Sequence, residues 1–258
     1  MRHAGAVLLL SRVTGRNVLG PDGRGVGRLT DLTVRVDGAD GPPVVNRLLV
    51  TRRGGPTLLV PWAAVEEFGP GPVVLAATRG FEVPALAEAL GPDELLLVRD
   101  VLDTQVVDVV GQRLARVADV LLSRDGDGPL ELAGVEVGFG GVVRRLGLGG
   151  DRATHDVVAW TDLHLASDRG HSVQLAAPRS AVHRLDARGL ATLISRIDVD
   201  AATEILAARD PQVAAEAVRT VHPDVAERIG RRSPLKGRRF FRSGVWPHRR
   251  HLFRGRKR

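Results

Sequence analysis

The sequence contains no cysteine and no tyrosine, and aromatic residues make up only 3% of it. Without cysteine the chain can form no disulfide, Cys-ligated zinc site or iron–sulfur cluster, and thiol catalysis is excluded. With so few rings, the cores must be filled by Val, Leu, Ala and Ile, and a ligand pocket walled by aromatic side chains is not expected. This composition fits a reducing cytoplasm.

Long apolar runs are also missing. No stretch approaches the roughly 18–20 residues that a membrane-spanning helix needs. The apolar N-terminal stretch ends at Ser11-Arg12, so it is too short for a secretory signal and reads as a first β-strand. We therefore expect a cytoplasmic protein, with a peripheral position at the inner face of the membrane as the alternative.

Catalytic signatures are the third absence. The sequence has no Gly-x-Ser-x-Gly, no His-Glu-x-x-His and no convincing carboxylate pair. The glycine-rich stretch 20–27 resembles a phosphate-binding loop, but a strand-like segment follows it instead of a helix, which favours a β-turn. We expect neither an enzyme nor an organic cofactor.

Positive charge is concentrated at the C-terminus. Residues 230–258 hold 12 of the 37 Lys and Arg and no acidic residue, so the remaining 25 basic and 30 acidic residues give 1–229 a formal charge of −5. Pro, Gly and Ser interrupt this tail, and we expect it to be disordered. It could lie on an anionic membrane, bind RNA, or remain solvated without a partner. The candidate contact residues are Arg231, Arg232, Lys236, Arg238, Arg239, Phe240, Phe241, Arg242, Trp246, Arg249, Arg250, Arg254, Arg256, Lys257 and Arg258.

An internal repeat covers the first two thirds of the chain. Shifted by 88 places, residues 23–38 align with 111–126 without a gap. In this alignment Asp31 matches Asp119, and the Asp-Gly pair at 37–38 matches the pair at 125–126. Apolar and polar residues alternate with a period of two in each copy, which indicates strands, and Asp-Gly is a hairpin signal. Strands this short and closely spaced favour a small barrel.

The motif Gly-x-x-x-Gly-x-x-x-Asp, followed by a Val-rich strand and by Val-Pro-Trp-x-x-Val at 60–65, resembles the PRC-barrel family. The opening segment 10–19 is similar to PRC-barrels of actinobacterial proteins associated with magnesium transport. The resemblance implies a six-stranded barrel used as an adaptor.

A period of twelve residues replaces the alternation from about residue 184. Asp186, Asp198, Asp210 and His222 occupy one column, and two further columns contain only Leu, Ile or Ala. Asp favours helix N-caps, and proline at 211 and 223 follows where it is tolerated. We predict one short helix per repeat, and these helices must stack because each is marginal alone.

This array resembles the N-terminal cytoplasmic domain of MgtE-type magnesium transporters, with the likeness carried by Leu185-Asp186, Ile197-Asp198 and Arg209-Asp210-Pro211. No segment resembles the CBS pair that usually follows in such proteins. Acidic residues in the array could contact Mg²⁺, which prefers oxygen ligands, and Asp198, Asp200 and Glu204 are the best candidates. The alternative is that they only favour the helix dipole. A second set, His155, Asp156, Asp162, His164 and His171, matches no known metal-ligand spacing.

Taken together, these patterns predict an α+β chain with two tandem PRC-barrel-like units (6–84 and 94–178), a helical array (181–230) and a basic tail (231–258). We expect a non-catalytic regulatory or scaffold protein associated with divalent-metal transport, with magnesium named by the resemblance. Its partners would be a membrane transport protein or an anionic membrane surface, and homo-oligomers are conceivable. The alternative is an RNA- or ribosome-associated factor, since a PRC-barrel also occurs in a ribosome maturation factor.

Overall fold

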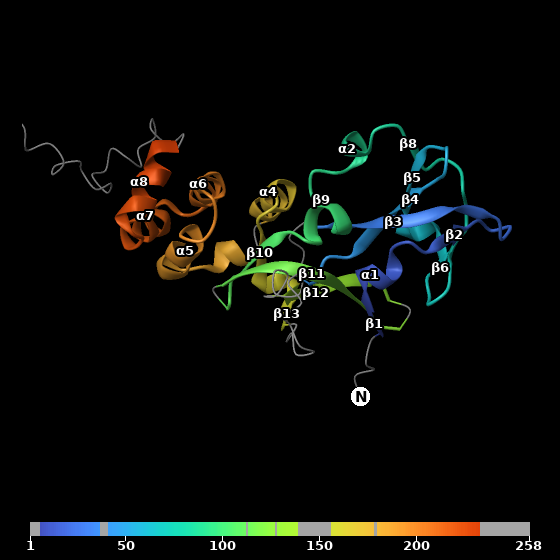
Figure 1. The fold of residues 1–258 in the computed structure, drawn as a ribbon, viewed down its shortest axis with the longest axis horizontal. Coiled ribbons are helices and arrows are strands. Elements are labelled where there is room, and N and C mark those ends of the chain that lie inside the picture. Colours follow the sequence, from blue (N-terminus) through green and yellow to red (C-terminus); the bar gives the residue numbers. More distant parts are fainter. Residues whose placement is uncertain are drawn as a thin grey trace, which may run out of the picture. The chain divides into compact units, whose positions relative to one another are not determined.

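The computed structural model describes residues 6–36, 41–111, 113–126, 128–138, 156–177 and 180–232. The chain forms two compact units, Met1–Ala181 and Val182–Arg258. The first contains two β-sheets and a few helical turns, and the second contains helices (Figure 1). The predicted α+β class is therefore confirmed. The predicted boundary between two separate β units stays a prediction, because residues 1–181 form one compact body.

The first sheet is built mainly from residues 17–83. Its strands run in the order β6-β7-β2-β3-β4-β5-β8, and β9 pairs with β3 outside this path. They are β2 (Asn17–Leu19), β3 (Gly25–Arg35), β4 (Val45–Thr51), β5 (Thr57–Pro61), β6 (Val65–Glu67), β7 (Val73–Leu75), β8 (Glu82–Val83) and β9 (Glu94–Leu96). A 3-10 turn, η1 (Trp62–Ala64), follows β5, and the short helix α2 (Leu86–Ala89) precedes β9.

The second sheet is built mainly from residues 105–165. Its order is β13-β12-β11-β10-β14, and β1 pairs with β11. The strands are β1 (Ala6–Leu9), β10 (Gln105–Asp108), β11 (Arg113–Arg124), β12 (Leu130–Gly138), β13 (Asp156–Ala159) and β14 (Leu163–Leu165). The turn η3 (Trp160–Asp162) follows β13 as η1 follows β5, and helix α4 (Asp168–Ala176) follows β14.

The two sheets have exchanged their first strands. The N-terminal strand β1 pairs with β11 of the second sheet, where Leu8 lies opposite Leu122. Strand β9, which opens the second copy, pairs with β3 of the first sheet, where Leu95 lies opposite Val34. Residues 34 and 122 are 88 places apart, as the repeat requires, so the two pairings have the same register.

Other details of the two sheets also correspond. The pairing of β3 with β4 shifts register between Leu29 and Asp31, and that of β11 with β12 shifts between Val117 and Asp119, again 88 places on. A four-residue helix α1 (Leu10–Val13) follows β1, whereas a five-residue π-helical turn η2 (Leu97–Val101) follows β9. The extra residue of η2 accounts for the repeat offset changing from 87 places in the exchanged strands to 88 afterwards.

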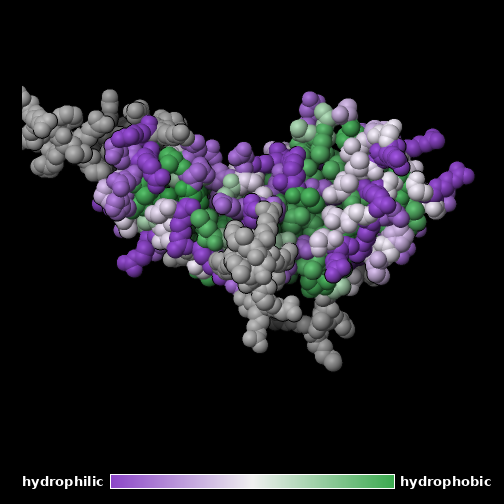
Figure 2. Space-filling view, viewed as in Figure 1, coloured by the Kyte–Doolittle hydropathy of each residue, from purple (hydrophilic) through white to green (hydrophobic). Residues whose placement is uncertain are grey.

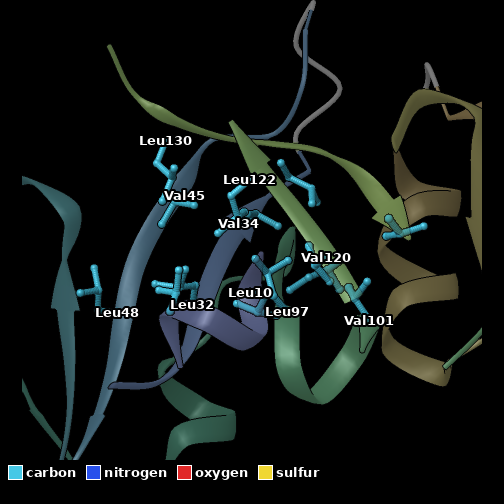
Figure 3. Packing of buried hydrophobic residues seen from close by; sticks show 14 of the residues in the cluster. Leu10, Leu32, Val34, Val45, Leu48, Leu97, Val101, Val120, Leu122 and Leu130 are labelled. Atoms are coloured by element: carbon cyan, nitrogen blue, oxygen red, sulfur yellow. The ribbon is translucent and has the colours of Figure 1, made fainter. Parts of the chain in front are cut away.

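One apolar core serves both copies. Leu10 and Leu97, at equivalent places in the exchanged segments, are both fully buried and belong to the same cluster as Leu32 and Val120. Figure 3 shows these side chains meeting between strands of the two sheets. Because apolar burial is the largest favourable contribution to folding, the copies stabilise each other.

Two expectations about the β region need correction. In the described residues both sheets are open, and neither closes into a barrel. The first strand of each copy pairs with the sheet of the other copy. The simple in–out alternation along β3 also fails, since Thr33 is fully buried together with Leu32 and Val34. On its face of the sheet, Thr33 belongs to a polar network with Glu94 and Arg47.

The turns predicted from the sequence agree with the structure where it describes them. The glycine-rich stretch forms a turn between β2 and β3, where the Gly23 amide donates to Gly20 O at 3.0 Å, as expected for a β-turn. Asp125-Gly126 lies in the connection from β11 to β12, with Gly126 at φ 55°, a left-handed conformation that suits glycine. The equivalent Asp37-Gly38 lies outside the described residues.

The second unit contains the four helices that the twelve-residue period predicts. They are α5 (Ala187–Ile194), α6 (Val199–Ala208), α7 (Pro211–Thr220) and α8 (Pro223–Arg232), preceded by the 3-10 turn η4 (Ala181–Arg184). The side chains of Asp186, Asp198 and Asp210 each cap the following helix by accepting backbone N–H groups. The predicted capping role is thus confirmed for all three.

Packing in this unit follows the predicted columns. Leu190, Ala202, Ala214 and Ala226 are all buried, and so are Leu193, Ile205, Ala217 and Ile229. Helix α5 packs mainly against α7, and α6 against α8. Helices two repeats apart therefore share a core, as stacked short helices require.

Candidate functional site

Two buried aspartates join the exchanged segments to the opposite copy. Asp119 on β11 accepts hydrogen bonds from the Ser11 amide at 3.1 Å, the Ser11 hydroxyl at 2.5 Å and the Val120 amide at 2.8 Å. Ser11 stands in the first turn of α1, where backbone N–H groups have no partner within the helix. The carboxylate therefore holds the start of α1 on the second sheet.

Asp31 on β3 makes the equivalent connection to η2. Its oxygens accept from the amides of Leu32 and Val98 at 2.7 Å each and of Arg99 at 3.2 Å. Burial raises the pKa of Asp31 to about 6 and outweighs these hydrogen bonds, which lower it. Asp31 accepts no hydroxyl hydrogen bond equivalent to that from Ser11, because valine occupies the corresponding position 98.

A buried glutamate fixes β9 in the first sheet. Glu94 accepts hydrogen bonds from the Thr33 hydroxyl at 2.5 Å, the Asn46 amide at 3.1 Å and the Arg47 Nε at 2.8 Å. Its side chain is 3% exposed. Burial raises the pKa of Glu94, but the hydrogen bonds from Arg47, Thr33 and the Gly91 and Asn46 groups outweigh it and bring the pKa to about 2. Glu94 is therefore an anion at neutral pH.

Apolar residues replace this polar network at the corresponding positions of the second sheet. By register, Val7 stands in the place of Glu94 and Gly134 in that of Arg47. Val7 is 62% exposed, and Val157 on the neighbouring part of this face is 61% exposed. On the visible surface of the molecule, Figure 2 shows hydrophobic residues where Figure 1 labels β1.

Two histidines of the second candidate metal set meet in the interior. His164 on β14 and His171 on α4 are 1% and 4% exposed, and the distance from His164 Nε2 to His171 Nδ1 is 2.8 Å. The rings are edge to face, with centroids 4.9 Å apart. Asp156 instead bonds Arg113 at 2.9 Å, and His155 lies outside the described residues. The structure thus brings two of the five residues together.

The proposed magnesium ligands lie at the start of α6. Asp198, Asp200 and Glu204 are all exposed, and Asp198 Oδ1 accepts from the amides of Asp200 and Ala201 at 3.0 and 2.9 Å. Among the described residues no group of three or more His, Cys, Asp or Glu side chains is placed to hold a metal ion. Magnesium contact at this position stays a prediction.

Only the beginning of the basic tail is described. Arg231 and Arg232 form the end of α8, and the Arg231 Nη2 donates to Glu227 at 2.7 Å. The other basic and aromatic residues of the predicted contact set, from Lys236 to Arg258, lie outside the described residues.

Sequence reasoning found some of these residues but not their roles. Asp31 and Asp119 were visible as a shared column of the repeat, which marks a position but does not reveal that its partner lies in the other copy. Glu94 gave no signal, because its contacts depend on strands that pair far apart in the sequence. His164 and His171, seven residues apart, were noted only as members of a metal-ligand set, and their spacing does not show that β14 and α4 bring the two rings together.

Comparison with models of known protein families gives no match, and comparison with curated proteins finds no relative. Within the described ranges, no helix has both the length and the apolar character that a membrane crossing requires.

Proposed function

We propose that this chain is a non-catalytic regulatory or scaffold protein associated with divalent-metal transport, and that magnesium is the metal. Its β copies would be PRC-barrel-like adaptor units, and its helices would correspond to the cytoplasmic array of MgtE-type transporters. The metal is named by that resemblance.

The observation that carries the scaffold proposal is how the buried carboxylates are used. Asp31, Glu94 and Asp119 each bind groups of a neighbouring strand or helical turn, and each connects segments that lie far apart in the sequence. Arg113 likewise joins Asp108 on β10 to Asp156 on β13. Buried charges employed in this way rigidify a body, which suits a platform that presents fixed surfaces to a partner.

The C-terminal region supplies the link to a membrane. The described part of the second unit ends in a helix that leads directly into a segment rich in Lys, Arg and aromatic residues. Basic residues near an anionic bilayer contribute about 1 kcal/mol each, and aromatic rings insert at the interface. The tail would therefore hold the scaffold beside a membrane transport protein.

The tail is tested by co-sedimentation with vesicles containing anionic lipid at about 0.15 M salt. The full chain should sediment, and a chain ending at Arg232 should remain in solution, because that truncation preserves α8. Replacing Phe240, Phe241 and Trp246 by Ala should weaken binding at constant charge. If RNA removes the protein from vesicles while vesicles cannot remove it from RNA, the RNA- or ribosome-associated alternative replaces the membrane proposal.

The link to metal transport needs a separate measurement. Cells lacking this protein should show a changed rate of Mg²⁺ uptake, restored by the full chain but not by the chain ending at Arg232. An unchanged uptake rate, with membrane binding intact, would remove magnesium from the proposal and leave the scaffold role.

A further inference from the structure

The buried contact between His164 and His171 connects two different elements of the first unit. His164 lies on β14, opposite Val107 of β10, and His171 lies on α4. Helix α4 also packs on β9 and η2. Polar contacts reinforce its position: Gln174 accepts from the Leu165 amide at 2.6 Å, and Arg169 donates to the Glu94 and Gly91 carbonyls at 2.9 and 2.6 Å.

A hydrogen bond between two imidazoles sets a limit on how many protons the pair can hold. One ring nitrogen must donate and the other must accept, so at least one ring has to be neutral. When both rings are protonated, all four nitrogens are donors and the two positive charges lie a hydrogen-bond length apart. Burial prevents water from screening that repulsion.

We propose that the His164–His171 pair is an acid-sensitive latch that holds α4 on the second sheet and releases it when the second imidazole is protonated. An unperturbed histidine takes up its proton near pH 6.5. In the closed state the second proton is disfavoured, so α4 is held at neutral pH and is released as the pH falls below that value.

The charged groups on the elements around the pair have defined partners of their own. On α4, Asp168 is exposed, and Arg169 binds the carbonyls named above. On the elements that pack against α4 and β14, the charged groups form three carboxylate–arginine pairs: Glu94 with Arg47, Asp100 with Arg99, and Asp108 with Arg113. Asp162 lies on η3, directly before β14. Both histidines also make further interactions. The bond between the two rings is nevertheless the contact that a second proton must break.

Hydrogen–deuterium exchange of the full chain between pH 7.5 and 4.5, corrected for intrinsic exchange, tests the latch. Protection of residues 163–177 should fall about tenfold per pH unit below the midpoint, as uptake of one proton requires. Protection of α5 to α7 should stay constant. The variant His171→Asn should lose this pH dependence, whereas the control His222→Asn, at an exposed helix start, should retain it.

A second readout avoids dependence on the stability of the variant. In the wild-type protein, NMR titration of the histidine ring carbons should show one ring of the pair taking up its proton only as α4 loses protection. Protection of 163–177 that is independent of pH, or two rings that become protonated while α4 stays protected, would overturn the latch.

Discussion

At the scale of single residues, equivalent positions of the two copies perform the same task with different chemistry. Asp119 receives a hydroxyl and two amides, while Asp31 receives three amides beside the carboxylate of Asp100. The two contacts involve different residues, so substituting one of the two aspartates leaves the contact of the other in place.

The raised pKa of Asp31 predicts a stability difference that depends on pH. Because the folded pKa of about 6 lies above the ordinary 3.8, the ionised carboxyl destabilises the fold at neutral pH, and this cost vanishes below pH 3.8. The Asp31→Asn variant has no carboxyl to ionise, so this cost should be absent at every pH. The free energy of unfolding of the wild type, relative to the variant, should fall by about 3 kcal/mol between pH 4 and pH 7. Parallel curves from urea titrations would contradict this.

Glu94 is the opposite case. Its pKa of about 2 lies below the ordinary 4.5, so its contribution is complete above pH 4.5 and is lost as the pH falls through 2. We expect Glu94→Gln to lower the free energy of unfolding at pH 7 by about 3 kcal/mol, since it leaves Arg47 without its anion. Glu88→Gln on the exposed surface of α2 is the matched control and should change little in the same denaturation experiment.

At the scale of elements, the helices of the second unit were predictable and the strand exchange was not. A helix start depends on local chemistry: an Asp side chain, the amides that follow it and a proline at the first position. The pairing of β1 with β11 depends on a choice between two acceptor strands, β3 and β11, that occupy equivalent places in the repeat. Alternation in the sequence indicates a strand but does not name its partner.

Capping predicts the effect of changing Asp198. Its side chain accepts from two amides at the start of α6, so Asp198→Ala should cost about 0.5 to 2 kcal/mol, whereas Asp198→Asn should preserve most of the stability. Amide exchange across α6 measures both variants. Equal losses in the two would show that charge, and not capping, stabilises this helix start.

The prediction of closed barrels was wrong for a reason that also concerns how elements pair. A barrel requires a sheet to pair with its own first strand, and here each first strand contributes to the other sheet. The period of two along a strand is the same in both arrangements. Among the candidate sites, the capping aspartates of the array were found because capping depends on neighbouring residues. The contact between the two histidines was not found, because it depends on how α4 packs against β14.

At the scale of the whole molecule, the shared core predicts that residues 1–181 unfold together. Leu97→Ala lies in the exchanged segment of the second copy, yet its side chain belongs to the core of both sheets. Removing it should cost about 2 to 5 kcal/mol and reduce exchange protection in β3 and β11 alike. Loss of protection in one sheet alone would mean that the copies are independent.

The strand exchange also has a consequence for synthesis on the ribosome. Ser11 meets Asp119 across 108 residues of chain, and β1 has no acceptor until β11 has emerged. Domains ordinarily fold as units while translation proceeds, the N-terminal one first. Here the apolar strand β1 stays unpaired while the 108 residues from Ser11 to Asp119 are made. We therefore expect the nascent chain during that interval to be the state most prone to aggregation.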